Sequence, residues 1–138
     1  MTRIDFYVLQ AQGRNERLQF AARLADKAWQ QGCKVLIRAA DAVMAEELDT
    51  LLWHFKPESF IPHSREPASE DPVVISLSAA NPFHGELLIN LADNLPEDFG
   101  HFQRLTEIVV QMPEVLSATR LLFGQYRERG YQVNTHKL

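Results

Sequence analysis

The sequence contains a single cysteine, Cys33, among its 138 residues. A lone cysteine excludes an internal disulfide and is typical of proteins in a reducing compartment. Residues 1–5 lead directly into a predicted strand, without an apolar segment or a cleavage site of small residues, so no secretory signal is predicted. We therefore expect a cytoplasmic protein in which Cys33 has a structural role.

Long hydrophobic runs are also missing. The longest, such as residues 73–77, fall far short of the roughly 20 residues that a membrane-spanning helix needs. With 46% hydrophobic and 23% charged residues, the composition is that of a globular protein. The length fits one domain over residues 1–138, because single domains commonly have about 100 to 150 residues.

Positive charge is scarce: the net charge is -4 and the isoelectric point is about 5.7. This argues against direct binding of nucleic acid, whose phosphates are neutralised by many cations. The charge is uneven, however. After residue 119 the sequence contains four basic residues, Arg120, Arg127, Arg129 and Lys137, and one acidic residue, Glu128. A basic region on an acidic protein favours a short acidic ligand.

Motifs for catalysis, metals and cofactors are absent. The loop of residues 10–15 contains only Gly13 and lacks the closely spaced glycines of phosphate loops. The five histidines lack metal-ligand spacing, and no serine lies in a nucleophile elbow. We expect no catalytic residue, metal or cofactor, and we expect the ring nitrogens of His63 to order the loop around it.

Hydrophobic periodicity predicts alternating strands and helices. Strands are expected at residues 4–9, 34–39, 73–77, 87–91 and 105–111, although the last also has helical spacing. Helices are expected to end at Gly32, to begin at Asp41 and end near residues 53–55, and to run from Pro113 to Gly130. Residues 131–138 are expected to form an extended tail.

This order predicts a three-layer α/β fold. A mostly parallel central sheet of about five strands would have helices on both faces. The architecture would be Rossmann-like or P-loop-like without the phosphate loop.

Residues 51–63 place large aromatic side chains where a polar loop is normally found. Trp53, Phe55, Phe60 and Ile61 lie here with two prolines, Pro57 and Pro62. The aromatic rings could pack on the chain's own core or anchor a partner protein, since Trp is enriched at interface anchors. The pattern leaves both interpretations open.

The same segment resembles the chi subunit family of the bacterial DNA polymerase III holoenzyme. The family has a Trp at a helix end followed some six residues later by a short motif, matched here by Trp53 and by Ser59, Phe60, Ile61, Pro62 and His63. Residues 6–9, 32–37 and 126–135 also match, and the likeness covers essentially the whole chain, more loosely over residues 64–94.

The resemblance implies a surface for the psi subunit of the clamp-loader complex, or for a DNA-repair helicase. Trp53 and Phe60 would be the anchors, with Phe55 beside them. Pro57, Ile61 and Pro62 would shape the loop.

The resemblance also implies a site for the acidic C-terminal tail of single-stranded-DNA-binding protein. Arg120 would bind the terminal carboxylate, if the segment after Pro113 is three residues shorter than in relatives. Leu116 and Phe123 would form the apolar wall, Met112 would close the pocket, and Arg127 would supply further charge. Alternatively, Arg120 covers a solvated helix face while Leu116 and Phe123 pack in the core.

We therefore expect a non-catalytic replisome adaptor resembling the chi subunit. The alternative is a small α/β nucleotide-binding protein or enzyme of unknown substrate, which would use the carboxyl ends of its strands.

Overall fold

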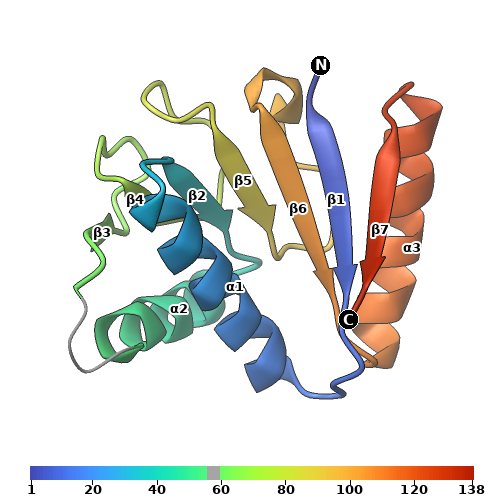
Figure 1. Cartoon of the computed structure of the whole chain (residues 1–138), viewed down its shortest axis with the longest axis horizontal. Coiled ribbons are helices and arrows are strands. Elements are labelled where there is room, and N and C mark those ends of the chain that lie inside the picture. Colours follow the sequence, from blue (N-terminus) through green and yellow to red (C-terminus); the bar gives the residue numbers. More distant parts are fainter. Residues whose placement is uncertain (56–59) are drawn as a thin grey trace.

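The computed structural model describes residues 1–55 and 60–138, and a parallel sheet runs through this part of the chain. Its seven strands have the order β3-β4-β2-β5-β6-β1-β7 (Figure 1). They are β1 (Arg3–Val8), β2 (Val35–Arg38), β3 (His63–Ser64), β4 (Val73–Ser76), β5 (Leu87–Asn90), β6 (Arg104–Val109) and β7 (Val133–Lys137). The helices are α1 (Arg14–Gln30), α2 (Ala42–His54) and α3 (Pro113–Glu128), with a short 3-10 helix η1 (Phe99–His101).

Helices cover both faces of the sheet, as predicted. On the first face, Ile37 and Ile89 pack beneath α1 and α2. On the second face, the alternate residues Leu36 and Leu88 belong to the hydrophobic cluster beneath α3 and η1. Because both faces are buried, the central strands are continuous apolar runs rather than alternating ones.

The direction of the connections determines which helix covers which face. From β1 to β2, and from β2 to β4, the chain moves toward the β3 edge, whereas from β6 it moves toward β7. Crossovers between parallel strands are right-handed, so connections in opposite directions place their helices on opposite faces. Figure 1 accordingly shows α2 near one edge of the sheet and α3 beside β7 at the other.

The helix ends follow the sequence signals. The Asp41 side chain accepts a hydrogen bond of 2.8 Å from the Met44 backbone N–H at the start of α2, and Pro113 begins α3. Gly32 and Gly130 follow α1 and α3 with φ of 83° and 87°, a conformation that glycine adopts without strain. In the described part of the chain, no helix is long and apolar enough to cross a membrane.

The number of strands differs from the prediction of about five. The two additional strands, β3 and β7, are the sheet edges. The predicted extended tail of residues 131–138 is instead largely β7, paired in parallel with β1 and held by a 2.8 Å contact between His136 Nε2 and Asp5 Oδ1. The strand predicted at residues 105–111 is confirmed as β6, despite its helical spacing.

A buried polar network joins α3 to the centre of the sheet. Tyr126 in α3 donates a 2.6 Å hydrogen bond to Glu107 Oε2 in β6, and Asn90 in β5 donates to the same oxygen at 2.8 Å. Arg38 in β2 donates to Asn90 Oδ1 at 3.0 Å. Glu107 Oε1 has no hydrogen-bond partner among the described residues. The network therefore fixes α3 relative to three strands.

The position of Glu107 makes its protonation sensitive to folding. Burial raises the pKa of Glu107 from 4.5 to about 7, while the bonds from Tyr126 and Asn90 and the charges of Arg17 and Arg38 lower it. Burial and the neighbouring Glu107 raise the pKa of the Tyr126 hydroxyl, so Tyr126 remains a donor.

We expect Glu107→Gln to remove a pH-dependent loss of stability. Between pH 4.5 and about 7 the native state binds more protons than the unfolded state, so wild-type stability falls as pH rises and is constant above this window. The full decrease amounts to about 3 kcal/mol. Urea unfolding at pH 5, 6, 7 and 8 measures it, with the exposed Glu128→Gln as matched control. A difference between wild type and Glu107→Gln that is independent of pH would contradict this assignment.

Candidate functional site

Two large aromatic side chains lie exposed where α2 leads toward β3. Trp53 is 52% exposed and Phe60 is 59% exposed. Their ring centroids are 5.4 Å apart, and the His63 ring lies 4.8 Å from that of Trp53. We call Trp53 and Phe60 the aromatic patch. Exposed aromatic pairs of this kind are typical of protein-binding surfaces.

The buried His63 side chain packs against the Trp53 ring of the aromatic patch. This side chain is almost fully buried, and Nδ1 lies 2.7 Å from the Ile61 carbonyl oxygen. Nε2 lies 3.1 Å from Asp49 Oδ1 in α2, although without hydrogen-bond geometry. The expected hydrogen bonding by the His63 ring within this loop is thus found for Nδ1 and not for Nε2.

The other residues expected at this surface have different environments. Ile61 is buried in the first-face core. Phe55 is half-buried and packs against the same core, and Pro62 is half-buried. Pro57 lies outside the described residues. The chain therefore combines a buried anchor, Ile61, with an adjacent exposed ring, Phe60.

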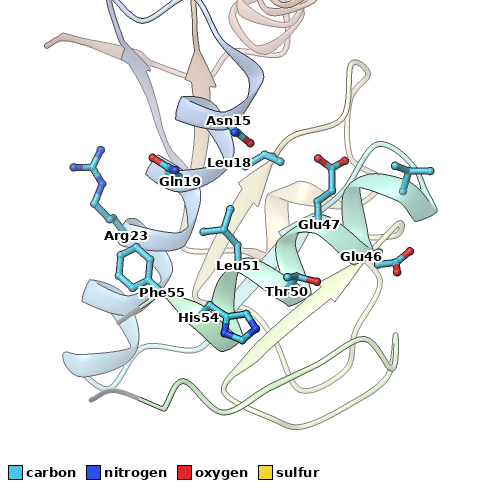
Figure 2. Close-up of a pocket in the computed structure, with 11 residues that line it drawn as sticks. Asn15, Leu18, Gln19, Arg23, Glu46, Glu47, Thr50, Leu51, His54 and Phe55 are labelled. Atoms are coloured by element: carbon cyan, nitrogen blue, oxygen red, sulfur yellow. The ribbon is translucent and has the colours of Figure 1, made fainter. Parts of the chain in front are cut away.

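A groove of about 900 Å³ runs between α1 and α2 (Figure 2). We call it the α1–α2 groove. The sequence prediction did not include it, because it is formed by residues that are scattered along two helices. Its lining consists of Asn15, Leu18, Gln19, Arg23, Val43, Glu46, Glu47, Thr50, Leu51, His54 and Phe55.

The second candidate surface lies on α3. Arg120 is exposed and forms no ion pair with any residue that the structure describes. Leu116 and Phe123 pack against the second-face cluster, with the Phe123 ring 5.4 Å from that of Phe6. Arg127 Cζ lies 5.8 Å from the Phe123 ring centroid. Cationic and apolar groups thus share one side of α3.

A cavity of about 430 Å³ opens between the end of α3 and β7. We call it the α3–β7 cavity, and its lining is Phe123, Arg127, Gly130, Tyr131, Gln132 and Val133. The contribution of β7 was missed because residues 131–138 were expected to be a tail. The alternation of Val133 and Thr135 with polar residues was the available signal.

The structure separates Met112 from the other residues expected at this surface. Met112 precedes α3 and packs against the first-face core, whereas Leu116 and Phe123 pack on the second face. Met112 and Arg120 are also eight residues apart, which corresponds to about 12 Å along the helix.

The start of α1 is occupied where a nucleotide-binding protein would hold phosphate. Here the Glu16 carboxylate lies against Gly13, so closely that an added Cβ on Gly13 would collide with it. A carboxylate at this position repels a phosphate and itself stabilises the positive end of the helix. No cluster of three or more potential metal ligands occurs in residues 1–55 and 60–138.

Comparison with known proteins identifies relatives along the full chain. Residues 1–134 match the family model described as DNA polymerase III chi subunit, HolC. The DNA polymerase III subunit chi of Pseudomonas aeruginosa is 45% identical over 100% of this chain and 98% of its own length. Those of Haemophilus influenzae and Escherichia coli are 30% and 27% identical, over 97% and 85% of this chain and 96% and 82% of their own lengths.

We expect the aromatic patch to contribute little to stability. Trp53→Ala and Phe60→Ala should each lower the free energy of unfolding by about 1 kcal/mol or less, since exposed positions tolerate substitution. Ile61→Ala, the buried neighbour, should lower it by about 2 to 5 kcal/mol. Urea denaturation distinguishes the two classes. Equal losses for Phe60→Ala and Ile61→Ala would place the Phe60 ring in the core.

Proposed function

This chain belongs to the DNA polymerase III chi subunit family, and we propose that it is a non-catalytic adaptor of the replisome. It would act in the cytoplasm and link the clamp-loader complex, through the psi subunit, to the C-terminal tail of single-stranded-DNA-binding protein. The observation that carries this proposal is the presence of two chemically different surfaces at opposite edges of one sheet.

The spacing of the two surfaces suits a bridge. The aromatic patch adjoins β3, and the α3–β7 cavity adjoins β7, which are the first and last strands of the sheet. Six strand spacings of about 4.8 Å separate these edges by roughly 30 Å. Two partners of ordinary size can therefore bind at the same time without contact between them.

The aromatic patch suits a folded protein partner such as psi. Trp53 and Phe60 offer an apolar surface in which the Trp53 ring contacts both Phe60 and His63. The two rings are therefore already packed before a partner binds, which lowers the entropic cost of binding. A DNA-repair helicase is a second possible occupant of the same patch.

The surface on α3 suits an acidic peptide that ends in phenylalanine. Arg120 can donate two parallel hydrogen bonds to a terminal carboxylate, and the α3–β7 cavity offers Phe123 and Val133 to an aromatic ring. Arg127 adds positive charge beside the cavity. The net charge of -4 over the whole chain disfavours direct binding of nucleic acid.

We expect Arg120→Ala to weaken the binding of an acidic peptide with a C-terminal phenylalanine by at least tenfold, because the carboxylate loses its donor. Arg65→Ala removes another exposed arginine, next to β3, and should leave the affinity unchanged. Calorimetry at 50 and 200 mM salt measures both, and affinity should decrease with salt. Equal affinities for wild type and Arg120→Ala would refute this site.

We expect Trp53→Ala and Phe60→Ala to abolish or strongly weaken psi binding, since truncation of an interface anchor typically costs about 2 kcal/mol or more. The same variants should bind the acidic peptide like wild type, because the two surfaces are separate. Calorimetry with purified psi is the measurement. Unchanged psi affinity in both variants would rule out the aromatic patch as the docking surface.

A further inference from the structure

The aromatic patch is too small to hold a protein partner alone. Trp53 and Phe60 are each about half exposed, and aromatic side chains bury about 150 to 250 Å² each, so together they offer on the order of 200 Å². A stable interface covers about 800 Å² on each partner. A protein that binds this patch must therefore also cover the surface next to it.

The adjoining surface on α2 is the α1–α2 groove. Glu46, Thr50 and Trp53 are exposed and spaced by four and three residues, so they form one ridge along α2. Two of them, Glu46 and Thr50, line the groove, and Trp53 belongs to the aromatic patch. The patch and the groove are thus continuous.

The residues that line the groove indicate which side chains an occupant should present. Leu18, Leu51 and Phe55 provide an apolar floor, and Val43, which is 66% exposed, lies at the start of α2. An occupant should therefore present an apolar stripe to the groove.

The charges of the groove lie at opposite ends. The Glu47 carboxylate is already paired with Arg14 at 2.6 Å, so Glu46 supplies the available negative charge at one end. Figure 2 shows Arg23 beside Phe55 at the other end of the groove. Phe55 is nine positions after Glu46, which corresponds to about 14 Å along the axis of α2. A complementary segment has a basic residue at the first end and an acidic residue at the second.

A helix fits this groove better than an extended segment. The walls are side chains of α1 and α2, whose backbone groups are bonded within the helices. An extended segment would bury N–H and C=O groups without partners, whereas a helix satisfies its own.

We propose that the α1–α2 groove holds an amphipathic helix of the psi subunit, and that the groove and the aromatic patch together form one interface. This inference rests on the proposed docking of psi on Trp53 and Phe60. It adds the secondary structure, polarity and position of the second part of the contact.

The test is calorimetry of psi with variants of the groove and matched controls. Thr50→Arg places a bulky charge in the middle of the groove and should weaken psi binding at least tenfold, whereas Ser117→Arg on α3 should change it less than twofold. Glu46→Arg should weaken binding as well, and Glu128→Arg should not. All four positions are exposed on helices, so folding is retained.

The outcomes separate this inference from the proposed function. Loss of psi binding in Trp53→Ala but not in Thr50→Arg would overturn the inference that psi occupies the α1–α2 groove, and would leave the proposed function intact. Absence of psi binding to the wild type would overturn both. Self-association of the wild type that Thr50→Arg abolishes, measured by sedimentation, would assign the groove to a second copy of this chain and overturn the inference.

Crosslinking tests the helix itself. A photoreactive benzoylphenylalanine in place of Thr50 should crosslink to residues of psi that are spaced three or four apart. Crosslinks to alternate residues would indicate a strand and overturn the assignment of a helix.

Discussion

The parallel sheet is the constraint on which the rest of the structure depends. A sheet of this kind must be covered on both faces, and right-handed crossovers decide which helix covers which face. Because the chain moves in one direction along the sheet through α1 and α2, and in the other through α3, these helices lie on opposite faces. The two candidate binding surfaces are therefore separated by the topology itself, rather than by any particular side chain.

The placement of α3 relies on a second, more local interaction. Tyr126 bonds to the buried Glu107, which also accepts a bond from Asn90. A buried carboxylate, one of whose oxygens has no partner in residues 1–55 and 60–138, is destabilising compared with an apolar residue. It nevertheless defines one register of the helix on the sheet. The same helix presents Arg120 and Phe123 one to two turns away, so the network fixes the geometry of that surface.

The sequence was sufficient to predict the layers of the fold, the central strands and the helix ends. Runs such as Val73–Ser76 and Leu87–Asn90 are mainly apolar because both sides of these strands are buried. The helix ends were predictable because Asp41 caps α2, Pro113 begins α3, and Gly130 follows α3 with a positive φ. The edge strands were not predicted. β3 has two residues, too few for any periodicity, and β7 is half polar because it borders solvent. Edge strands obey weaker packing constraints, so their sequences carry a weaker signal.

Residue type alone could not decide which apolar residues of residues 51–63 are exposed. Ile61 and Phe60 are neighbours in sequence, but only Ile61 enters the core, whereas the Phe60 side chain is exposed. Likewise, Met112 and Leu116 pack on opposite faces because the chain turns into α3 between them. Such differences depend on tertiary geometry.

For the adaptor role that we propose, the arrangement would allow modest contacts to be sufficient. When two partners belong to one assembly and their sites lie on one rigid body, binding of the first partner makes binding of the second intramolecular, with an effective concentration that reaches the millimolar range for short connections. Rigidity here comes from the sheet, which connects the β3 edge to the β7 edge through continuous backbone hydrogen bonds. In the proposed role neither surface would need high affinity alone, and each partner could exchange while the other remained bound. A protein with this task requires no reactive group, only two separate surfaces and a stiff connection between them.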